Sequence, residues 1–545
     1  PFTDSHTVDN SALFDKGSTQ YMTRSTWGTS TDTTKWTLSM WVKRGALGKQ
    51  RLVDAGSNLS NQTIIEFTAT DAFDFQLYVA PNSGRITSNR LFKQTNTWTH
   101  LVIVHDSSNG TANDKMRMYV NGSRVTSLAN NSPPTSNLSV MTINGQNTTI
   151  GYDLINTSNP FDGYMSEVIF VDGYALDASP FGQTDTSTNR WIPKTVTATT
   201  LNTAGGGSSG FGTNGFYLNM ADKLDLGDDE SGNSNDFTET NMDASGGNQM
   251  YDTPTRNTAI ISPDAWINTG GAGFSTGGVT ISGGNLTAAL SSSSIGAVSR
   301  GWSEWGVQSG KWYFENTLIV KAAYGTGGVG VASAYNSDDV TNGTSYYWQN
   351  QPPLAINYYP ENNNGGTQEL RRNVNNSNSI LGTQTITAGD TMALALDLDS
   401  TPKTVKFYYN NTLKDTYTIT NSNLWFIPIT AYSGGGTSSY NFGQWVRLNS
   451  VDMTLNGTAG GYFRYTPPTD HKAFNQDNLP ENTGNITGFS WIKNRDAGDN
   501  NILQDRVRGV TNYSISNSTA QQATDANSVQ KFLQQGVQVG NMDAV

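Results

Sequence analysis

Two aromatic- and amide-rich segments are the strongest binding-site candidates in this sequence. Each sets tyrosine or tryptophan beside an asparagine or glutamine amide. An aromatic ring can stack on the apolar face of a sugar, and the amides can bond its hydroxyls. The alternative is that these aromatics fill the end of a β-sandwich or a subunit contact. The candidate glycan-binding residues are Tyr346, Tyr347, Trp348, Gln349, Asn357, Tyr358 and Tyr359.

An acidic loop is the second candidate site. Ca²⁺ takes roughly six to eight oxygen ligands from flexible loops, so this segment could hold calcium, although its spacing is not that of an EF-hand. The alternative is an acidic turn between strands, because Asp, Asn and Gly also dominate turns for backbone reasons. No other segment requires a cofactor, so calcium is the only cofactor for which the sequence offers candidate ligands. The loop residues are Asp228, Asp229, Asn233, Asn235 and Asp236.

The sequence offers little for catalysis. Asp397 and Asp399 share one face of a predicted strand, about 7 Å apart, which could suit a glycosidase pair. The leucines that alternate with them assign the core to the other face, so an outer, solvated face explains both carboxylates. The 4 histidines are widely separated and show no zinc or Ser-His-Asp spacing. We therefore expect no catalytic residues and no enzymatic activity.

Composition narrows the class of protein and partner. The 545 residues predict three to four domains, and the 13 Trp, 23 Tyr and 21 Phe spread along the chain argue against disorder. The net charge of −12 argues against a nucleic-acid partner, which needs a basic stripe. No run approaches the ~18 apolar residues of a membrane span, so we expect no membrane insertion. Cysteine is absent, so no disulfide forms.

Alternating strand-like runs between Gly, Asn and Asp turns fill almost every segment, which predicts β-sandwiches. In the first block, Trp36, Leu38, Met40 and Val42 share one strand face; in a later block, Met392, Leu394, Leu396 and Leu398 do the same.

A helical period is scarce, and its best candidates are Ser518–Gln535 and a short turn at Asp177–Phe181. The composition of Ala204–Gly210 predicts a flexible linker.

The first block carries an ordered series of motifs: "WTLSMWVKR", "TWTHLVIVHD", "KMRMYVNGSRV", "TTIGYDL" and "FDGYMSEVIFVDGYAL". This series resembles a laminin-G-like (LamG), concanavalin A-type jelly roll, in the version found in structural proteins of marine bacteriophages. The strings "RWIPK", "FGTNGFYLNM" and "YDTPTRNTA" follow in the order of those proteins. Lectin-like sandwiches of this type sometimes bind calcium, which adds to the case for the acidic loop.

The second block carries "SGKWYFENTLIV", "GGVGVA", "AGDTMALALDLDSTPKTVKFYYNN", "LWFIPITAYSGGG" and "SYNFGQ". These motifs resemble a SPRY domain, another two-sheet binding sandwich. From "GFSWIKNRD" onward the chain resembles the opening half of a further β-domain of the same phage proteins. We expect that this domain either continues beyond Val545 or is completed by another chain.

These observations predict an all-β, multi-domain string of antiparallel β-sandwiches. The expected parts are a LamG-like jelly roll (1–180), a connector packed on it (181–265), a SPRY-like sandwich (266–455), and an extended connector with the start of a third β-domain (456–545). By resemblance, the protein is a virion appendage: a tail fibre, a head fibre or a decoration protein on the virion surface. Its partners would be host-surface glycans, other virion proteins and itself, as a homo-oligomer with trimers expected by analogy. The alternatives are a purely architectural filament or capsid-decorating subunit without a ligand, and a polysaccharide depolymerase fibre.

Overall fold

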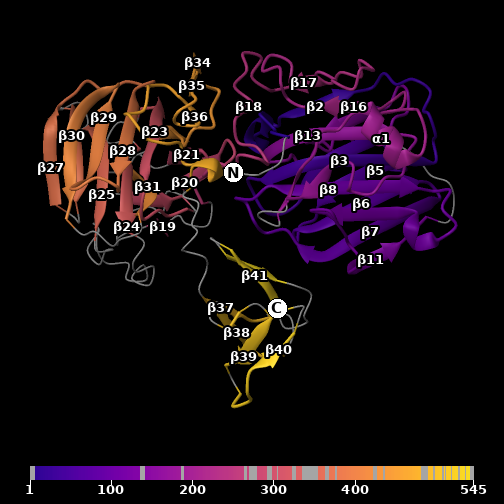
Figure 1. The fold of residues 1–545 in the computed structure, drawn as a ribbon. Coiled ribbons are helices and arrows are strands. Elements are labelled where there is room, and N and C mark those ends of the chain that lie inside the picture. The colour runs from indigo at the N-terminus through magenta and orange to yellow at the C-terminus, as the bar shows by residue number, and fades with distance from the viewer. Residues whose placement is uncertain are drawn as a thin grey trace. The chain divides into compact units, whose positions relative to one another are not determined.

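Antiparallel β-sheets make up almost all of the computed structural model (Figure 1). The chain divides into two compact units, Pro1–Asn478 and Leu479–Val545. In the described part of the chain, no helix is long and apolar enough to cross a membrane. The structure describes residues 6–134, 141–185, 190–262, 267–268, 279–290, 298–303, 305–321, 327–333, 354–362, 368–374, 377–420, 426–433, 436–479, 489–494, 498–505, 508–509, 511–516, 518–525, 528–533 and 536–539.

The first sandwich packs two antiparallel sheets face to face. Sheet A has the strand order β10-β9-β8-β3-β13-β1-β18, with β16 also paired to β13, and sheet B has the order β11-β7-β6-β5-β4-β12-β2-β17. The strands of sheet A are β10 (Ser123–Arg124), β9 (Met116–Val120), β8 (Thr99–Asp106), β3 (Lys35–Arg44), β13 (Gly163–Asp172), β1 (Ser11–Phe14), β18 (Gln249–Met250) and β16 (Phe216–Leu218). The strands of sheet B are β11 (Leu128–Ser132), β7 (Asn82–Leu91), β6 (Ala72–Val79), β5 (Asn61–Phe67), β4 (Gln50–Asn58), β12 (Asn147–Ile150), β2 (Tyr21–Arg24) and β17 (Thr238–Thr240).

The core between sheets A and B follows the period-2 alternation of the sequence. The four β3 side chains predicted to share one face all lie in this core and are at most 2% exposed. Trp36 of β3 meets Phe75 of β6 edge-on, with ring centroids 5.5 Å apart. Burying each such side chain contributes about 1.5–3 kcal/mol, so this core holds the two sheets together.

Residues 174–217 cover the outer face of sheet A. Their apolar side chains meet Val102 and Val104 of β8 and Ile169 and Val171 of β13 in a second buried cluster. The cover includes the hairpin of β14 (Gly182–Thr184) and β15 (Trp191–Pro193) and the helix α1 (Ala198–Gly205). Both faces of β3 and β13 are therefore buried. The covering side chains are Leu176, Ala178, Phe181, Val196, Leu201 and Phe211.

The glycine-rich segment 204–210, predicted to be a flexible linker, packs against Tyr174 instead. The Tyr174 hydroxyl accepts a hydrogen bond from Ser209 N at 2.9 Å. A Cβ added to Gly205 would lie 2.6 Å from the Tyr174 ring, and one added to Gly207 would lie 2.3 Å from its hydroxyl. The linker prediction is wrong, because these glycines let the backbone approach the ring closely.

A buried ion pair, the Lys43 clamp, joins the first sandwich to the segment that leads into the second. Lys43 Nζ donates to Asp252 Oδ2 at 2.7 Å, to Asn257 Oδ1 at 2.8 Å and to the Thr258 carbonyl oxygen at 2.9 Å. Trp98 Nε1 donates to Asp252 Oδ1 at 2.9 Å. Both charged side chains are 0% exposed. Each charge is thus fully bonded in the interior, which is the condition for a buried pair to persist.

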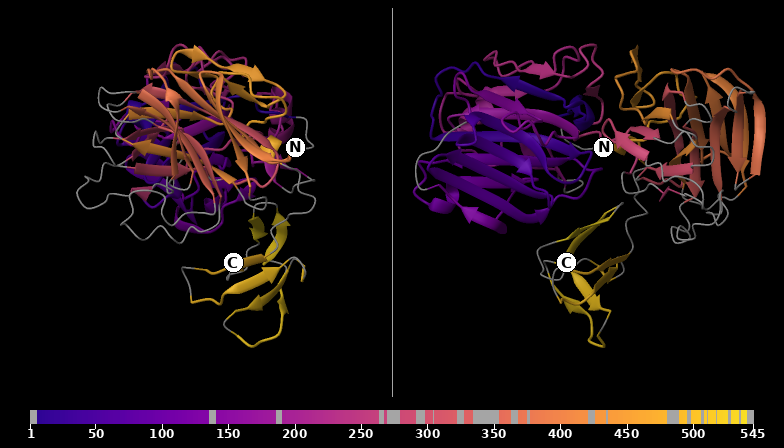
Figure 2. Two further views of the ribbon diagram at one scale, coloured as in Figure 1. Left: turned by 90° about the vertical axis from the view of Figure 1, so that its left-hand side faces the viewer. Right: turned by 180° about the vertical axis from the view of Figure 1, so that it is seen from behind.

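The second sandwich packs sheet C, with order β19-β22-β31-β24-β25-β26-β27, on sheet D, with order β20-β21-β32-β23-β28-β29-β30; Figure 2 shows it from two further sides. Met392, Leu394 and Leu396 of β28 are each 0–1% exposed, as their alternation predicts. The strands of sheet C are β19 (Ile267–Asn268), β22 (Val298–Trp302), β31 (Phe426–Ser433), β24 (Val329–Ser333), β25 (Ala355–Asn362), β26 (Gln368–Val374) and β27 (Ser377–Thr383). The strands of sheet D are β20 (Val279–Ser282), β21 (Thr287–Leu290), β32 (Gly436–Asn441), β23 (Lys311–Val320), β28 (Thr391–Asp397), β29 (Lys403–Tyr409) and β30 (Thr412–Ile419).

Residues 454–475 pack on the outer face of sheet D. Phe463 meets the ring of Tyr313 edge-on at 5.0 Å, in a cluster with Ala393 and Ala395 of β28. The carboxylate of Glu315 accepts the backbone N–H groups of residues 464 and 465. This segment therefore belongs to the first compact unit. Its short strands are β35 (Thr454–Asn456) and β36 (Gly461–Phe463), and the strands β33 (Arg447–Leu448) and β34 (Val451–Asp452) precede it.

In the second unit, the structure contradicts the helix expected over Ser518–Gln535. Where this segment is described it contains strands and no helix. Val529 is 0% exposed, and its backbone N–H and C=O bond Gln504 Oε1 and Thr511 N. Pairing across the sheet thus overrides the local Ala/Gln preference. The strands are β37 (Phe489–Ile492), β38 (Ile502–Asp505), β39 (Asn512–Ile515), β40 (Ala523–Thr524), β41 (Val529–Leu533) and β42 (Gly536–Val539).

Candidate functional site

The outer face of sheet B carries charged and polar side chains where sheet A carries apolar ones. At three positions in β4, β5 and β6, a buried apolar residue is followed by a polar residue on the opposite face. Lys49 and Arg85 reach solvent here, each with 43% of its side chain exposed. This face is therefore the polar side of the sandwich, with Lys49 and Arg85 at its surface. The alternating pairs are Val53 and Asp54, Ile65 and Glu66, and Phe73 and Asp74.

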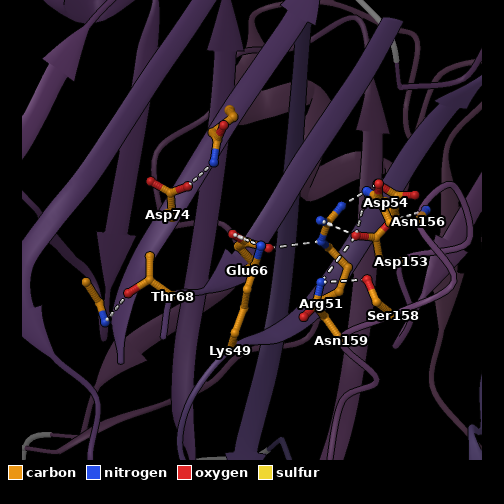
Figure 3. Close-up of polar contacts among 12 residues, drawn as sticks. Lys49, Arg51, Asp54, Glu66, Thr68, Asp74, Asp153, Asn156, Ser158 and Asn159 are labelled. Atoms are coloured by element: carbon orange, nitrogen blue, oxygen red, sulfur yellow. Dashed lines mark hydrogen bonds and ion pairs between the residues drawn. The ribbon is translucent and has the colours of Figure 1, made fainter. Parts of the chain in front are cut away.

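Arg51 lies at the centre of a buried cluster of three carboxylates on this face (Figure 3). Its Nη1 donates to Asp54 Oδ1 at 2.5 Å, its Nη2 to Asp153 Oδ2 at 2.7 Å, and its Nε to Glu66 Oε2 at 3.2 Å. All four side chains are at most 4% exposed. We call this set the Arg51 cluster. It fixes Asp54 rigidly, because a buried carboxylate cannot leave its cation without a large penalty.

Three separate segments build the Arg51 cluster. Arg51 and Asp54 come to one face of β4 because the register with β5 shifts between Arg51 and Val53, a β-bulge. The loop after β12 supplies Asp153, whose carboxylate also accepts the backbone N–H of Asn156 at 3.0 Å. The backbone N–H of Arg51 in turn donates to the Asn159 carbonyl oxygen at 2.8 Å. The loop is thereby folded against β4.

A polar pocket of about 550 Å³ opens beside Asp54. We call it the Asp54 pocket. The side-chain oxygen Oε1 of Gln146 is buried and has no hydrogen-bond partner in the described structure. Leu59 at the rim is 61% exposed. The pocket thus combines unused acceptor capacity with an aliphatic wall. Its lining residues are Asp54, Gly56, Ser57, Asn58, Leu59, Gly145, Gln146, Asn147, Leu154 and Ile155.

A pair of tyrosines adds an aromatic surface to the same face. Tyr21 of β2 and Tyr152, the residue before Asp153, stack with ring centroids 5.1 Å apart and an interplanar angle of 17°. Both side chains are half-buried. Such a pair can contact the apolar face of a sugar beyond the pocket itself.

Burial raises the pKa of the Asp54 carboxyl from 3.8 to about 6, against the opposing effects of the Arg51 charge and the Gln62 amide. A carboxyl whose folded pKa is raised takes up protons on folding, so its contribution to stability falls as pH rises from about 4 to 6. A two-unit shift corresponds to about 3 kcal/mol. We expect the difference in unfolding free energy between wild type and Asp54→Asn to fall by roughly this amount over that window. Urea unfolding at a series of pH values measures it, and parallel curves for the two proteins would contradict it.

Gly56 lines the pocket, and its position has no room for a side chain. Its φ is +143°, and an added Cβ would lie 2.1 Å from the Asn61 carbonyl oxygen. We expect Gly56→Ala to lower the unfolding free energy by about 2 kcal/mol or more, because the backbone of the β4–β5 turn must shift. Gly110→Ala, where no atom lies within 4 Å of the added Cβ, should change it by less than about 0.5 kcal/mol. Equal effects in urea unfolding would exclude this role for Gly56.

The aromatic segments predicted to bind glycan do not form one exposed surface in the described structure. Tyr346, Tyr347, Trp348 and Gln349 lie outside the described residues. Tyr358 is 0% exposed and stacks on Phe407 of β29 at 4.6 Å, and its hydroxyl donates to Asp415 Oδ2 at 2.9 Å.

Its two neighbours differ in exposure. Asn357 is 3% exposed, whereas Tyr359 is half-buried and its hydroxyl donates to Asn378 Oδ1 at 3.2 Å, so glycan binding by Tyr359 stays a prediction. The ring of Tyr358 therefore belongs to the core of the second sandwich and cannot stack on a sugar. The composition of a segment does not distinguish a binding aromatic from a core aromatic.

The acidic loop uses its oxygen atoms to hold its own backbone. The Asp229 carboxylate accepts from Tyr217 N, Ser231 N, Ser231 Oγ and Asn235 N at 2.8–2.9 Å. Asp236 Oδ1 accepts the Asp229 N–H, and the Asn233 amide donates to the carbonyl oxygens of residues 212 and 215. Asp229 is therefore not presented to a calcium ion, and calcium at this loop stays a prediction.

A second hollow, of about 660 Å³, lies where this acidic loop meets residues 446–462. Asp228 and Glu230 line it together with Asp222, Lys223 and Asp452, and the last two form an exposed ion pair at 3.0 Å. Within the described residues, no three His, Asp or Glu side chains converge as a metal-binding group. The hollow is acidic, but its described side chains do not form a metal-binding site.

The candidate carboxylates on the second sandwich are also bonded within the chain. Asp397 accepts from Ser400 Oγ and pairs with Lys311, and Asp399 accepts the Gly310 N–H at 2.7 Å. These bonds stabilise a strand end, and they agree with the interpretation of both residues as an outer strand face.

Comparison with protein-family models assigns two parts of the chain. Residues 16–179 match the concanavalin A-like lectin/glucanases superfamily, so the first sandwich is a concanavalin A-like domain. Residues 476–545 match a domain family of unknown function, DUF7483. No curated protein matches the chain in sequence. The predicted fold class, all-β with several antiparallel sandwiches, is confirmed by this match and by sheets A to D.

Solved structures similar to the chain include both kinds of sandwich. A candidate carbohydrate-binding protein of Bacteroides ovatus is 15% identical over 31% of this chain (TM-score 0.24), and the match spans only 44% of that protein. The SPRY domain of human HERC1 is 14% identical over 36% of this chain and 99% of its own (TM-score 0.22). The carbohydrate-binding module CBM66 of Bacillus subtilis is 8% identical over 32% of this chain and 92% of its own (TM-score 0.21). At these TM-scores the likenesses say nothing of what this chain binds.

Proposed function

We propose that the first sandwich is a non-catalytic glycan-binding domain and that the Asp54 pocket is its binding site. The observation that carries the proposal is the polar pocket of about 550 Å³ whose lining includes Asp54, held by the Arg51 cluster, and Gln146, whose Oε1 has no partner in the described structure. A buried acceptor without a donor costs about 1–3 kcal/mol, which a ligand hydroxyl would recover. A rigid floor also lowers the ordering cost of binding.

The lining suits a sugar ring. Gln146 Oε1 and the Asp54 carboxylate can accept from sugar hydroxyls, and the amides of Asn58 and Asn147 can donate to them. Leu59 and Leu154 offer aliphatic contact for ring C–H groups. Binding sites of this kind combine a few placed polar groups with an apolar wall.

We propose that the site does not hydrolyse its ligand. Glycosidases use one free carboxylic acid and one free carboxylate on opposite sides of the scissile bond. Asp54 and Asp153 instead both bond the same guanidinium, at 2.5 Å and 2.7 Å. Incubation of the protein with the polysaccharide it binds should leave the polymer length unchanged, and shortening of the polymer would overturn this point.

A glycan array followed by calorimetry on the full chain tests the binding proposal. We expect binding that Gln146→Ala weakens about tenfold, the effect of losing one hydrogen bond of about 1.4 kcal/mol. The matched control is Asn131→Ala, since Asn131 is an exposed amide on β11 of the same sheet and does not line the pocket. Binding that survives Gln146→Ala unchanged would move the site elsewhere, and no binding to any glycan would favour a purely architectural role.

We further propose that the protein is an appendage protein of a virion that displays this domain to host-surface glycans as a homo-oligomer. The order of motifs described above supports the setting. The Lys43 clamp supports display, because it ties the glycan-binding sandwich to the next segment of the chain by buried bonds. Imaging of particles labelled with an antibody against the chain tests the proposal, and label confined to the host cell would overturn it.

A further inference from the structure

The Asp54 pocket offers a ligand one ionisable side chain and no cation. Asp54 is the single Asp, Glu, Lys, Arg or His among the described residues that line it. The nearest cation, Arg51, is 1% exposed, and each of its three nitrogens bonds a carboxylate. An anionic ligand would therefore meet a carboxylate without an available positive partner.

The charges around the pocket do not cancel. Asp54, Glu66 and Asp153 face Arg51 and Lys49, and Lys49 pairs with Glu66 at 3.5 Å. Three carboxylates thus meet two cations, which leaves a residual negative charge. Asp74 on the neighbouring strand β6 is paired with Arg85 and adds no net charge.

We infer that the Asp54 pocket selects uncharged sugars and excludes uronic acids and sulfated sugars. This inference rests on the proposed glycan-binding function and names its ligand class. A sugar hydroxyl can donate to the Asp54 carboxylate, so a neutral sugar gains a charge-assisted bond there. A ligand carboxylate or sulfate can only accept and is repelled by Asp54, and like charges placed together at a partly desolvated site are strongly unfavourable.

Matched pairs of trisaccharides test the selectivity. The probes are β-1,4-linked glucose, β-1,4-linked mannose and α-1,4-linked galactose trisaccharides, each beside the uronate of the same linkage, which differs only at C6. Calorimetry on the full chain at pH 8 and low salt should show at least one neutral trisaccharide binding at least about tenfold more tightly than its uronate. A uronate that binds as tightly as its neutral partner, or more tightly, overturns the inference while the glycan-binding proposal stands. Absence of binding by all six overturns both.

Two variants assign the selectivity to charge at the pocket. Asp54→Asn keeps an oxygen acceptor for Arg51 and Gln62 and should reduce the discrimination to within about threefold. Asn58→Asp, at an exposed rim position, adds a carboxylate and should increase the discrimination between the neutral sugar and its uronate. This variant leaves the Arg51 cluster unchanged. Discrimination that is unchanged in both variants overturns the inference.

Acidification of the wild type provides a third readout. At pH 5 the Asp54 carboxyl, with its pKa near 6, is largely protonated. The charged groups on the adjoining strands and loop are Asp153, Glu66, Asp74, Arg51, Lys49 and Arg85. Discrimination measured at pH 5 should be smaller than at pH 8. Discrimination that grows on acidification contradicts the assignment to Asp54.

Discussion

Asp252→Ala is expected to lower the free energy of unfolding by about 3–5 kcal/mol, because it leaves Lys43 charged and unpaired in the interior. The two side chains are 0% exposed, and the same carboxylate also binds Trp98 Nε1. Thermal and urea unfolding of the full chain measures the loss. We expect the two sandwiches of the first compact unit to unfold in one transition in the wild type and in two transitions in the variant.

The control for this result is the exposed pair of Lys223 and Asp452, whose side chains are 36% and 58% exposed. Lys223→Met should cost less than about 1 kcal/mol, since solvent screens such pairs. Similar losses for Asp252→Ala and Lys223→Met would show that the Lys43 clamp does not hold the unit together.

Arg51→Met is expected to have an effect of the same size, about 3–5 kcal/mol at pH 8, because it leaves the buried Asp54 and Asp153 carboxylates without a cation and Glu66 with Lys49 alone. The loss should shrink as pH falls toward 5. Without Arg51 the pKa values of Asp54 and Glu66, already raised by burial, rise further, and protonation then relieves the buried charge. Unfolding free energies of wild type and variant at pH 5 and pH 8 check both statements.

Arg85→Met is the matched control on the same face of sheet B. Asp74 keeps its bonds from Gln76 and Thr87 when Arg85 is removed, and Arg85 is 43% exposed. We expect a smaller loss than for Arg51→Met, because one buried carboxylate loses a half-exposed cation while two neighbouring side chains still donate to it. If Arg51→Met is no worse than Arg85→Met, the Arg51 cluster does not hold the floor of the pocket.

Strand alternation was enough to predict the sandwiches. Trp36 and Leu394 fall on the predicted core faces, since a period of two assigns a face without knowledge of the partner strand. It failed where tertiary packing outweighed local composition. Residues 204–210 read as a linker although Tyr174 fills the space beside their glycines, and Val529 lies in a strand although its neighbours favour helix.

The candidate site was not predictable from the sequence. Arg51 and Asp153 are about 100 residues apart, and their contact depends on a β-bulge in β4 and on a loop that folds back on it. Charged residues are rarely fully buried, so sequence alone assigns Arg51 to the surface. The one available signal was Asp54 in the apolar run "RLVDAG". The aromatic segments were more conspicuous, yet Tyr358 lies in the core.

A crystal structure of the full chain with its bound oligosaccharide is the most direct test of the Asp54 pocket as the binding site. The account predicts a sugar ring within hydrogen-bonding distance of Gln146 Oε1 and the Asp54 carboxylate, with the Arg51 cluster unchanged beneath it. An oligosaccharide bound at the second sandwich, with the Asp54 pocket empty, would contradict it.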